Sequence, residues 1–128
     1  MTAAPAKPKI LVVEDKPSVS ATMIGLLKRV GCDAVSAQTG TEGIRLAQAE
    51  AFDLITLDID LPDIDGLEVC RRLKQDQRCF QTPVIFVSGR VCEGHRQRCL
   101  KLGAADYIVK PFDTFAFVTR IFFHLNNT

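Results

Sequence analysis

Five short apolar runs, each followed by a stretch with helical spacing, constrain the fold of this chain more than any other feature. The runs are rich in β-branched residues and apolar at nearly every position, which is typical of strands buried on both faces of a sheet. Strands are expected at residues 9–14, 33–37, 52–58, 83–88 and 106–109, and helices at residues 17–30, 39–50, 65–74, 93–102 and 113–125. This alternation predicts a doubly wound α/β fold, a parallel sheet of five strands between layers built from five helices.

Length and charge restrict the chain to one ordinary globular domain. At 128 residues it is long enough to bury a core and too short for two typical domains. Its 16 basic and 15 acidic residues give a net charge of +1, which supplies no field for nucleic acid or an anionic membrane. We expect a flexible leader over residues 1–8 and one domain over residues 9–126.

No segment predicts export, a membrane span or a cysteine-based site. The apolar runs are only a few residues long, and the first residues lack the apolar core of a signal peptide. The five cysteines form no C-x-x-C pair, so neither a zinc site nor a disulfide framework is indicated. A cytoplasmic location is therefore expected, with the cysteines as small apolar residues of the core.

Polar side chains follow four of the predicted strands at the point where each strand ends. Glu14 and Asp15 follow the first strand, Asp58 the third, Ser88 the fourth and Lys110 the fifth. In doubly wound sheets, ligands bind outside the carboxyl ends of the strands. We therefore expect these five side chains to converge at one edge of the sheet.

Three carboxylates, a hydroxyl and a lysine together have the chemistry of a phosphoryl-transfer site. Asp58, at the end of the predicted central strand, has the position of a nucleophile that forms an acyl phosphate. Glu14 and Asp15 supply the hard oxygen ligands that Mg²⁺ prefers. Lys110 and Ser88 can each bind a phosphoryl oxygen. Each residue alone also fits a helix cap or a turn, but their joint placement favours the functional interpretation.

The residues around these positions resemble the receiver domains of two-component response regulators, the single-domain chemotaxis receivers among them. The resemblance extends over residues 9–125, and its matching segments are residues 10–15, 53–68, 83–89 and 103–112. It implies a flavodoxin-like sheet with the strand order 2-1-3-4-5. It also implies a phosphoacceptor in a phosphorelay, which catalyses only its own phosphorylation and dephosphorylation and is otherwise no enzyme. Both a stand-alone regulator and a module of a longer protein fit the sequence.

The resemblance assigns a role to each residue of the predicted site. Asp58 would accept a phosphoryl group from a histidine kinase or a histidine phosphotransfer protein, while Lys110 and Ser88 hold that group. The cofactor would be Mg²⁺ or Mn²⁺. Its ligands would be Glu14, Asp15, Asp58 and the backbone carbonyl of Asp60.

Tyr107 matches the aromatic switch residue of the family, which changes rotamer when the residue at the Ser88 position moves toward the phosphate. The face made of the fourth helix, fifth strand and fifth helix would then bind an output partner or a second copy of the chain. The resemblance implies neither direct nucleic acid binding nor a membrane.

Asp60 and Arg90 depart from the usual pattern of this family. Both lie two residues beyond a site residue, Asp58 and Ser88 respectively, at positions that the family uses to tune the lifetime of the phosphoryl group. We expect the two side chains to pair across the entrance of the site. Alternatively, Asp60 orients an attacking water and shortens the lifetime of the acyl phosphate. Two solvated loop charges without a role are the simpler interpretation.

The last predicted helix carries more phenylalanines than one buried stripe needs. Phe117 and Ile121 fit the core stripe, whereas Phe115 and Phe122 are seven residues apart and are expected to share an outer face. An exposed aromatic patch there would be an interface for a dimer or another partner. Local overpacking against the core is the structural alternative.

Three other site types fit the acids less well. Asp58-Ile-Asp60 resembles the D-x-D motif of haloacid-dehalogenase-like phosphatases, but their second acidic cluster follows the lysine and here it precedes Asp58. A receiver-like scaffold that is never phosphorylated usually lacks the acceptor, the acids or the lysine, and all are present. An EF-hand loop beginning at Asp58 would need its glycine at the sixth position, and Gly66 is the ninth. Asp65 and Gly66 are therefore expected mainly to begin a helix.

Overall fold

Five parallel strands and five helices alternate along the chain, as the sequence predicts. The computed structural model describes residues 7–90 and 93–127, so most of the predicted leader lies outside the described residues. The strands are β1 (Lys9–Val13), β2 (Asp33–Ala37), β3 (Leu54–Leu57), β4 (Val84–Ser88) and β5 (Asp106–Val109). The helices are α1 (Pro17–Arg29), α2 (Gly40–Ala49), α3 (Gly66–Gln75), α4 (Glu93–Lys101) and α5 (Thr114–Asn126). Most predicted boundaries agree within one or two residues.

The sheet has the order β2-β1-β3-β4-β5, and every neighbouring pair is parallel. The predicted strand order and fold class are therefore confirmed. The chain reverses its direction of winding between β1 and β3, which lie side by side in register from Ile10 and Leu54 onward. Because all strands run the same way, their carboxyl ends meet at one edge of the sheet.

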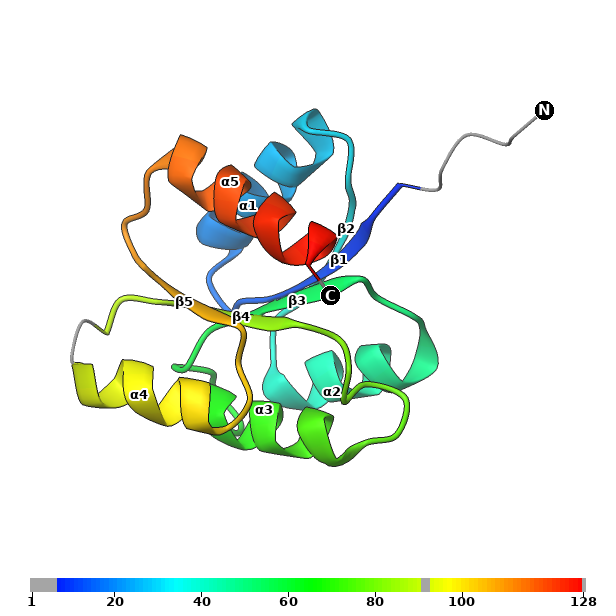
Figure 1. The fold of residues 1–128 in the computed structure, drawn as a ribbon, viewed down its shortest axis with the longest axis vertical. Coiled ribbons are helices and arrows are strands. Elements are labelled where there is room, and N and C mark those ends of the chain that lie inside the picture. Colours follow the sequence, from blue (N-terminus) through cyan, green and yellow to red (C-terminus); the bar gives the residue numbers. More distant parts are fainter. Residues whose placement is uncertain (1–6, 91–92, 128) are drawn as a thin grey trace.

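Helices cover both faces of the sheet (Figure 1). One face packs against α1 and α5, where Leu27 and Phe117 are fully buried beside Ile10 and Val12 of β1. The opposite face packs against α2, α3 and α4 and forms a second core cluster around Phe86 of β4. This burial on both faces explains why the strands read as continuous apolar runs.

Helix ends follow local chemistry that the sequence makes visible. Asp65 begins α3 by accepting a hydrogen bond from the backbone N–H of Glu68 at 2.9 Å, and Asp113 does the same for α5. After α1, Gly31 adopts φ of 91°, a left-handed conformation that only glycine takes up without strain. The predicted helix starts are therefore correct to within a residue.

Helix α4 is the least anchored helix of the sheet's lower face in Figure 1. Of its side chains from Gly94 to Lys101, only that of Cys99 is buried, whereas α3 buries four residues including Val69 and Leu73. Within the described residues, no helix is long and apolar enough to cross a membrane.

Candidate functional site

The carboxyl edge of the sheet brings the predicted site residues together. Glu14 and Asp15 directly follow β1, Asp58 directly follows β3, and Lys110 directly follows β5. The backbone hydrogen bonding of the sheet continues to these positions. For example, the N–H of Asp58 donates to the carbonyl of Val13 at 3.1 Å. The side chains therefore start from the ends of β1, β3 and β5, at the same edge of the sheet.

Three carboxylates form an acidic cluster at the centre of this edge. One oxygen each of Glu14, Asp15 and Asp58 lies within 4.8 Å of the other two. Glu14 is 1% exposed and Asp58 is 5% exposed, whereas Asp15 is half-buried. A cluster of hard, anionic oxygen donors has the composition that binds a divalent cation such as Mg²⁺. The residues present therefore fit a metal of this kind.

Lys110 is the cation that contacts the acidic cluster. Its ammonium donates to Asp58 Oδ2 at 3.0 Å and also to Glu14 Oε1. Burial favours loss of the lysine proton, but the hydrogen bonds to Glu14 and Asp58 outweigh it and raise the pKa of Lys110 above its usual value. Lys110 therefore stays charged, and the three carboxylates outnumber it.

Burial acts on Glu14 in the opposite sense. Loss of solvent around this carboxyl raises its pKa above the usual 4.5, although Lys110 and the backbone N–H of Lys16 both donate to it and lower the pKa. The nearby charge of Asp58 adds to the increase. The charged form of Glu14 therefore costs the folded state some free energy, and a bound divalent cation would offset this cost.

The loop between β3 and α3 lies tightly against the end of β3. The backbone N–H of Asp60 donates to Asp58 Oδ1 at 3.2 Å, and the N–H of Gly66 donates to the carbonyl of Ile59 at 2.8 Å. A Cβ atom at position 66 would stand 2.1 Å from the carbonyl oxygen of Asp58, so no residue with a side chain fits there. Gly66 thus does more than begin a helix, which the sequence analysis missed because the close approach joins parts of the chain that only the fold brings together.

The pair expected between Asp60 and Arg90 is present. Arg90 Nη2 donates to Asp60 Oδ1 at 2.6 Å, and Arg90 Nε donates to the same carboxylate at 3.1 Å. This hydrogen bonding lowers the pKa of Asp60 below its usual value. Both side chains are about half exposed, with fractions of 55% and 46%. The role of this pair in phosphoryl lifetime stays a prediction.

Ser88 and Tyr107 meet at the backbone of Arg90. The N–H of Arg90 donates to Ser88 Oγ at 3.3 Å, and the hydroxyl of Tyr107 donates to the carbonyl of Arg90 at 2.6 Å. Ser88 is fully buried and Tyr107 is 4% exposed. One residue, Arg90, therefore contacts Asp60, Ser88 and Tyr107 through different atoms.

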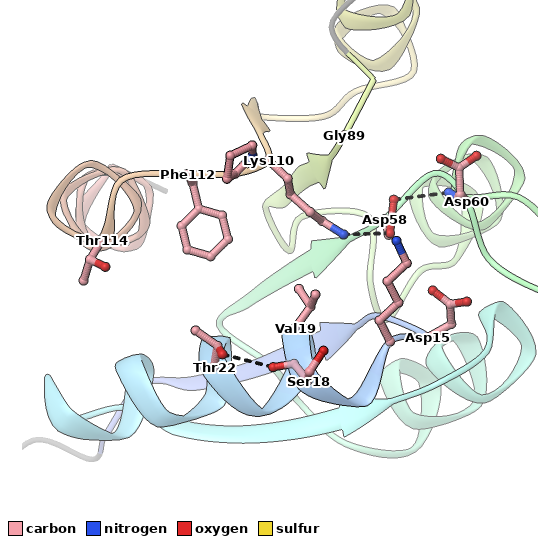
Figure 2. Close-up of a pocket in the computed structure, with 12 residues that line it drawn as sticks. Asp15, Ser18, Val19, Thr22, Asp58, Asp60, Gly89, Lys110, Phe112 and Thr114 are labelled. Atoms are coloured by element: carbon pink, nitrogen blue, oxygen red, sulfur yellow. Dashed lines mark hydrogen bonds and ion pairs between the residues drawn. The ribbon is translucent and has the colours of Figure 1, made fainter.

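A cavity of about 670 Å³ opens from the acidic cluster between α1 and the segment that follows β5. Figure 2 shows Lys110 reaching toward Asp58 from one side of this cavity, with Asp15 on the other side. Val19 of α1 and Phe112 form its apolar part. The carboxylate of Asp58 is thus reached through a hollow large enough for an amino-acid side chain.

The prediction that Phe115 and Phe122 share an outer face of α5 is only partly correct. Phe115 is 79% exposed, as expected, but Phe122 is half-buried and packs against the core cluster that holds Phe117 and Ile121. Val118 and Leu125 also pack against this cluster, so α5 is covered on more of its surface than the stripe of Phe117 and Ile121. Phe123, which is 59% exposed, is the second outward phenylalanine.

Comparisons with known proteins agree with this geometry. A family model described as the response regulator receiver domain matches residues 10–122. The alkaline phosphatase synthesis transcriptional regulatory protein PhoP of Bacillus subtilis is 40% identical over 104 residues, which are 81% of this chain and 42% of that protein. The phosphate regulon transcriptional regulatory protein PhoB of Rhizobium meliloti is 38% identical over 114 residues, 89% of this chain and 50% of that protein. The chain thus spans half or less of these relatives.

Solved structures give the same result over nearly the whole length. The non-phosphorylated HemR receiver domain from Leptospira biflexa is 31% identical and superposes with a TM-score of 0.86, covering 93% of this chain and 94% of its own. A CheY-like response regulator receiver domain protein from Methanospirillum hungatei is 26% identical with a TM-score of 0.89, covering 94% of this chain and 95% of its own.

Proposed function

Because the chain belongs to the response regulator receiver domains, we propose that Asp58 accepts a phosphoryl group from a phosphohistidine of a partner protein. The observation that carries this proposal is the acidic cluster at the end of the central strand, with the ammonium of Lys110 on Asp58 Oδ2 at 3.0 Å. A histidine kinase or a histidine phosphotransfer protein is the proposed donor.

In the proposed reaction, a carboxylate oxygen of Asp58 attacks phosphorus. A new O–P bond forms while the P–N bond of the phosphohistidine breaks, and its electron pair leaves with the imidazole. Mg²⁺ or Mn²⁺ would be held by Glu14, Asp15, Asp58 and the backbone carbonyl of Asp60, and the metal supplies charge neutralisation between two anions. The protein is then no enzyme toward other molecules, and it catalyses only its own phosphorylation and dephosphorylation.

Lys110 and Ser88 hold the transferred group in this proposal. Lys110 already contacts Asp58, so its ammonium needs to shift only from a carboxylate oxygen to a phosphoryl oxygen. Ser88 donates its hydroxyl to another phosphoryl oxygen and loosens its contact with the N–H of Arg90. Tyr107, bonded to the carbonyl of the same residue, then changes position and carries the signal to α4.

The face formed by α4, β5 and α5 is the proposed output surface, and its charges favour an acidic partner. The cations Arg96, Arg98 and Lys101 are exposed, and none has an ion-pair partner within the described part of the chain. Asp106 is already engaged by Arg120. A two-fold homodimer through the same face is the other expected assembly. Sedimentation that detects a dimer of the phosphorylated domain would overturn this choice.

Labelling tests the central proposal. The domain is incubated with Mg²⁺ and a small acyl phosphate or a phosphohistidine donor, and the mass of the intact protein is measured. We expect one phosphoryl group on the wild type and none on Asp58→Asn, with Asp106→Asn as the matched control that keeps the label. Hydroxylamine should remove the label, because it cleaves acyl phosphates. A label that persists in Asp58→Asn, or turnover of a phosphate ester, would contradict the proposal.

The Asp60–Arg90 pair is proposed to set how long the phosphoryl group lasts. While Arg90 holds the carboxylate of Asp60, that carboxylate is engaged and cannot orient a water toward the acyl phosphate. We expect Arg90→Ala to shorten the phosphoryl half-life several-fold and Asp60→Asn in the same chain to restore it. An unchanged half-life in Arg90→Ala and in Asp60→Asn would leave the pair as two solvated charges.

The domain over residues 9–126 and its cytoplasmic location stay predictions. A cytoplasmic location fits a receiver that takes its phosphoryl group from a kinase, and it is checked by fractionation of cells that express the protein.

A further inference from the structure

The carboxylate of Asp63 caps a helix other than the one that follows it. Asp63 lies in the loop between β3 and α3, five residues after Asp58. Its Oδ1 accepts from the backbone N–H of Gly40 at 2.8 Å, and its Oδ2 accepts from the N–H of Thr41 at 2.8 Å and from the Thr41 hydroxyl. These N–H groups open α2, where they have no partner within the helix.

Charge complements these hydrogen bonds. The N-terminus of a helix carries a partial positive charge, which favours an anion there. The hydroxyl of Thr41 and the backbone N–H groups of Gly40 and Thr41 hold the pKa of Asp63 well below its usual range. Asp63 therefore stays ionised, and the contact with α2 persists at neutral pH.

Close packing adds a second contact between this loop and α2. A Cβ atom at position 40 would stand 2.6 Å from Ile64 Cγ1 and 3.2 Å from the Ile64 carbonyl oxygen, so the helix start and the loop touch. At the other end of the loop, Gly66 lies against the carbonyl of Asp58. The segment 59–65 is thus held from two directions.

We propose that Asp63 is a positioning residue for the phosphoacceptor site, an inference that rests on the proposed function. It touches no reacting atom. By fixing residues 59–65 to α2, it keeps the backbone of Asp60 in place, whose N–H binds Asp58 Oδ1 and whose carbonyl is the expected fourth metal ligand. Outer contacts that orient metal ligands commonly affect metal affinity.

The test compares two caps of the same helix end. Thr39→Ala removes the cap that α2 supplies itself, in which Thr39 Oγ1 accepts from the N–H of Glu42 at 3.0 Å. Asp63→Ala removes the cap that comes from the loop. Both should lower the urea midpoint, and Asp63→Ala should lower it more, because it leaves two N–H groups of α2 without a partner whereas Thr39→Ala leaves one. Only Asp63→Ala should release the segment 59–65.

Three measurements separate the two variants. We expect Asp63→Ala to weaken Mg²⁺ binding about tenfold, to slow labelling by a small acyl phosphate, and to speed hydrogen exchange at the amides of Asp60 and Leu61. Thr39→Ala should leave all three close to the wild type, and Asp63→Asn, which keeps one acceptor oxygen, should fall between. Equal effects of Asp63→Ala and Thr39→Ala would overturn the inference. A wild type that takes no label would instead overturn the proposed function, whereas hydrogen exchange still tests the loop contact.

Discussion

Strand β5 joins two clusters of charged side chains that differ in their balance. At its start, Asp106 is 2.9 Å from Arg120 Nη2 and 2.9 Å from His124 Nε2, so one acid meets one guanidinium and one imidazole. Just beyond its end, Lys110 meets Glu14 and Asp58, so one base meets two acids, with Asp15 close by. The first cluster is satisfied within the chain, whereas the second has negative charge in excess.

The difference distinguishes an ion pair that links two elements from a cluster whose charge is not balanced by its own side chains. Each carboxylate oxygen of Asp106 has a partner on α5, Arg120 or His124, so this carboxylate links β5 to α5. The cluster at Asp58 is buried, and its unbalanced negative charge costs the fold some stability that a bound cation would restore. Excess charge of one sign in a buried site is therefore the better indicator of function than the number of ion pairs.

Removing the base from each cluster should give the largest contrast. Lys110→Ala leaves two buried carboxylates without their cation and should lower the free energy of unfolding by about 3 kcal/mol. Arg120→Ala should cost about 1 kcal/mol or less, because that side chain is 41% exposed. Urea denaturation without Mg²⁺ measures both values.

A second variant and added Mg²⁺ test the cause of the loss in Lys110→Ala. Asp58→Asn added to Lys110→Ala should recover part of the loss, because one of the stranded carboxylates is gone. Mg²⁺ should also recover part of the loss in Lys110→Ala, since a cation that binds only the folded state stabilises it. Equal losses in Lys110→Ala and Arg120→Ala would mean that the two clusters do not differ as described.

The dependence of stability on pH should show a smaller effect. The pKa of Glu14 is raised in the folded state, so the folded chain binds this proton more tightly than the unfolded chain. The resulting stability is fully present below about pH 4.5 and is lost as the pH rises through the raised pKa. The glutamine of Glu14→Gln does not titrate and therefore causes no such loss. The free energy of unfolding of Glu14→Gln should thus increase relative to that of the wild type as the pH rises toward neutrality.

Denaturant melts between pH 4.5 and 7 measure this difference. Asp33→Asn, at the exposed start of β2, is a control for the removal of an acid outside the cluster. If the free energy of unfolding changed with pH in the same way in Glu14→Gln and the wild type, burial would not raise the pKa of Glu14 as described.

The sequence predicts those parts of the site that depend on strand ends. The positions of Glu14, Asp58 and Lys110 follow from apolar runs that stop at a polar residue, together with the rule that parallel strands end at one edge. Helix starts such as Asp65 follow from local hydrogen bonding within a stretch of four residues, here from Asp65 to Glu68.

Contacts between segments far apart in the chain were not predictable in the same way. Gly66 and Asp63 each look like ordinary turn residues, and their importance appears only when Asp58 and the start of α2 are seen beside them. Phe122 has the helical position of an outward residue, but tertiary packing near the end of α5 covers it. Helical periodicity predicts the face of the helix on which a side chain lies, but it does not predict which other segments pack against that face.

Helix α4 rests on a single buried thiol among its described side chains, that of Cys99, while the helix beside it buries four residues. Displacing α4 by an ångström or two would therefore expose little apolar surface and cost little free energy. Displacing α3, whose first residue lies against the carbonyl of Asp58, would disturb the acidic cluster itself. The molecule thus combines a stiff side, which holds the site around Asp58 in place, with a compliant side next to it, which is the side on which the proposed change at Tyr107 would act.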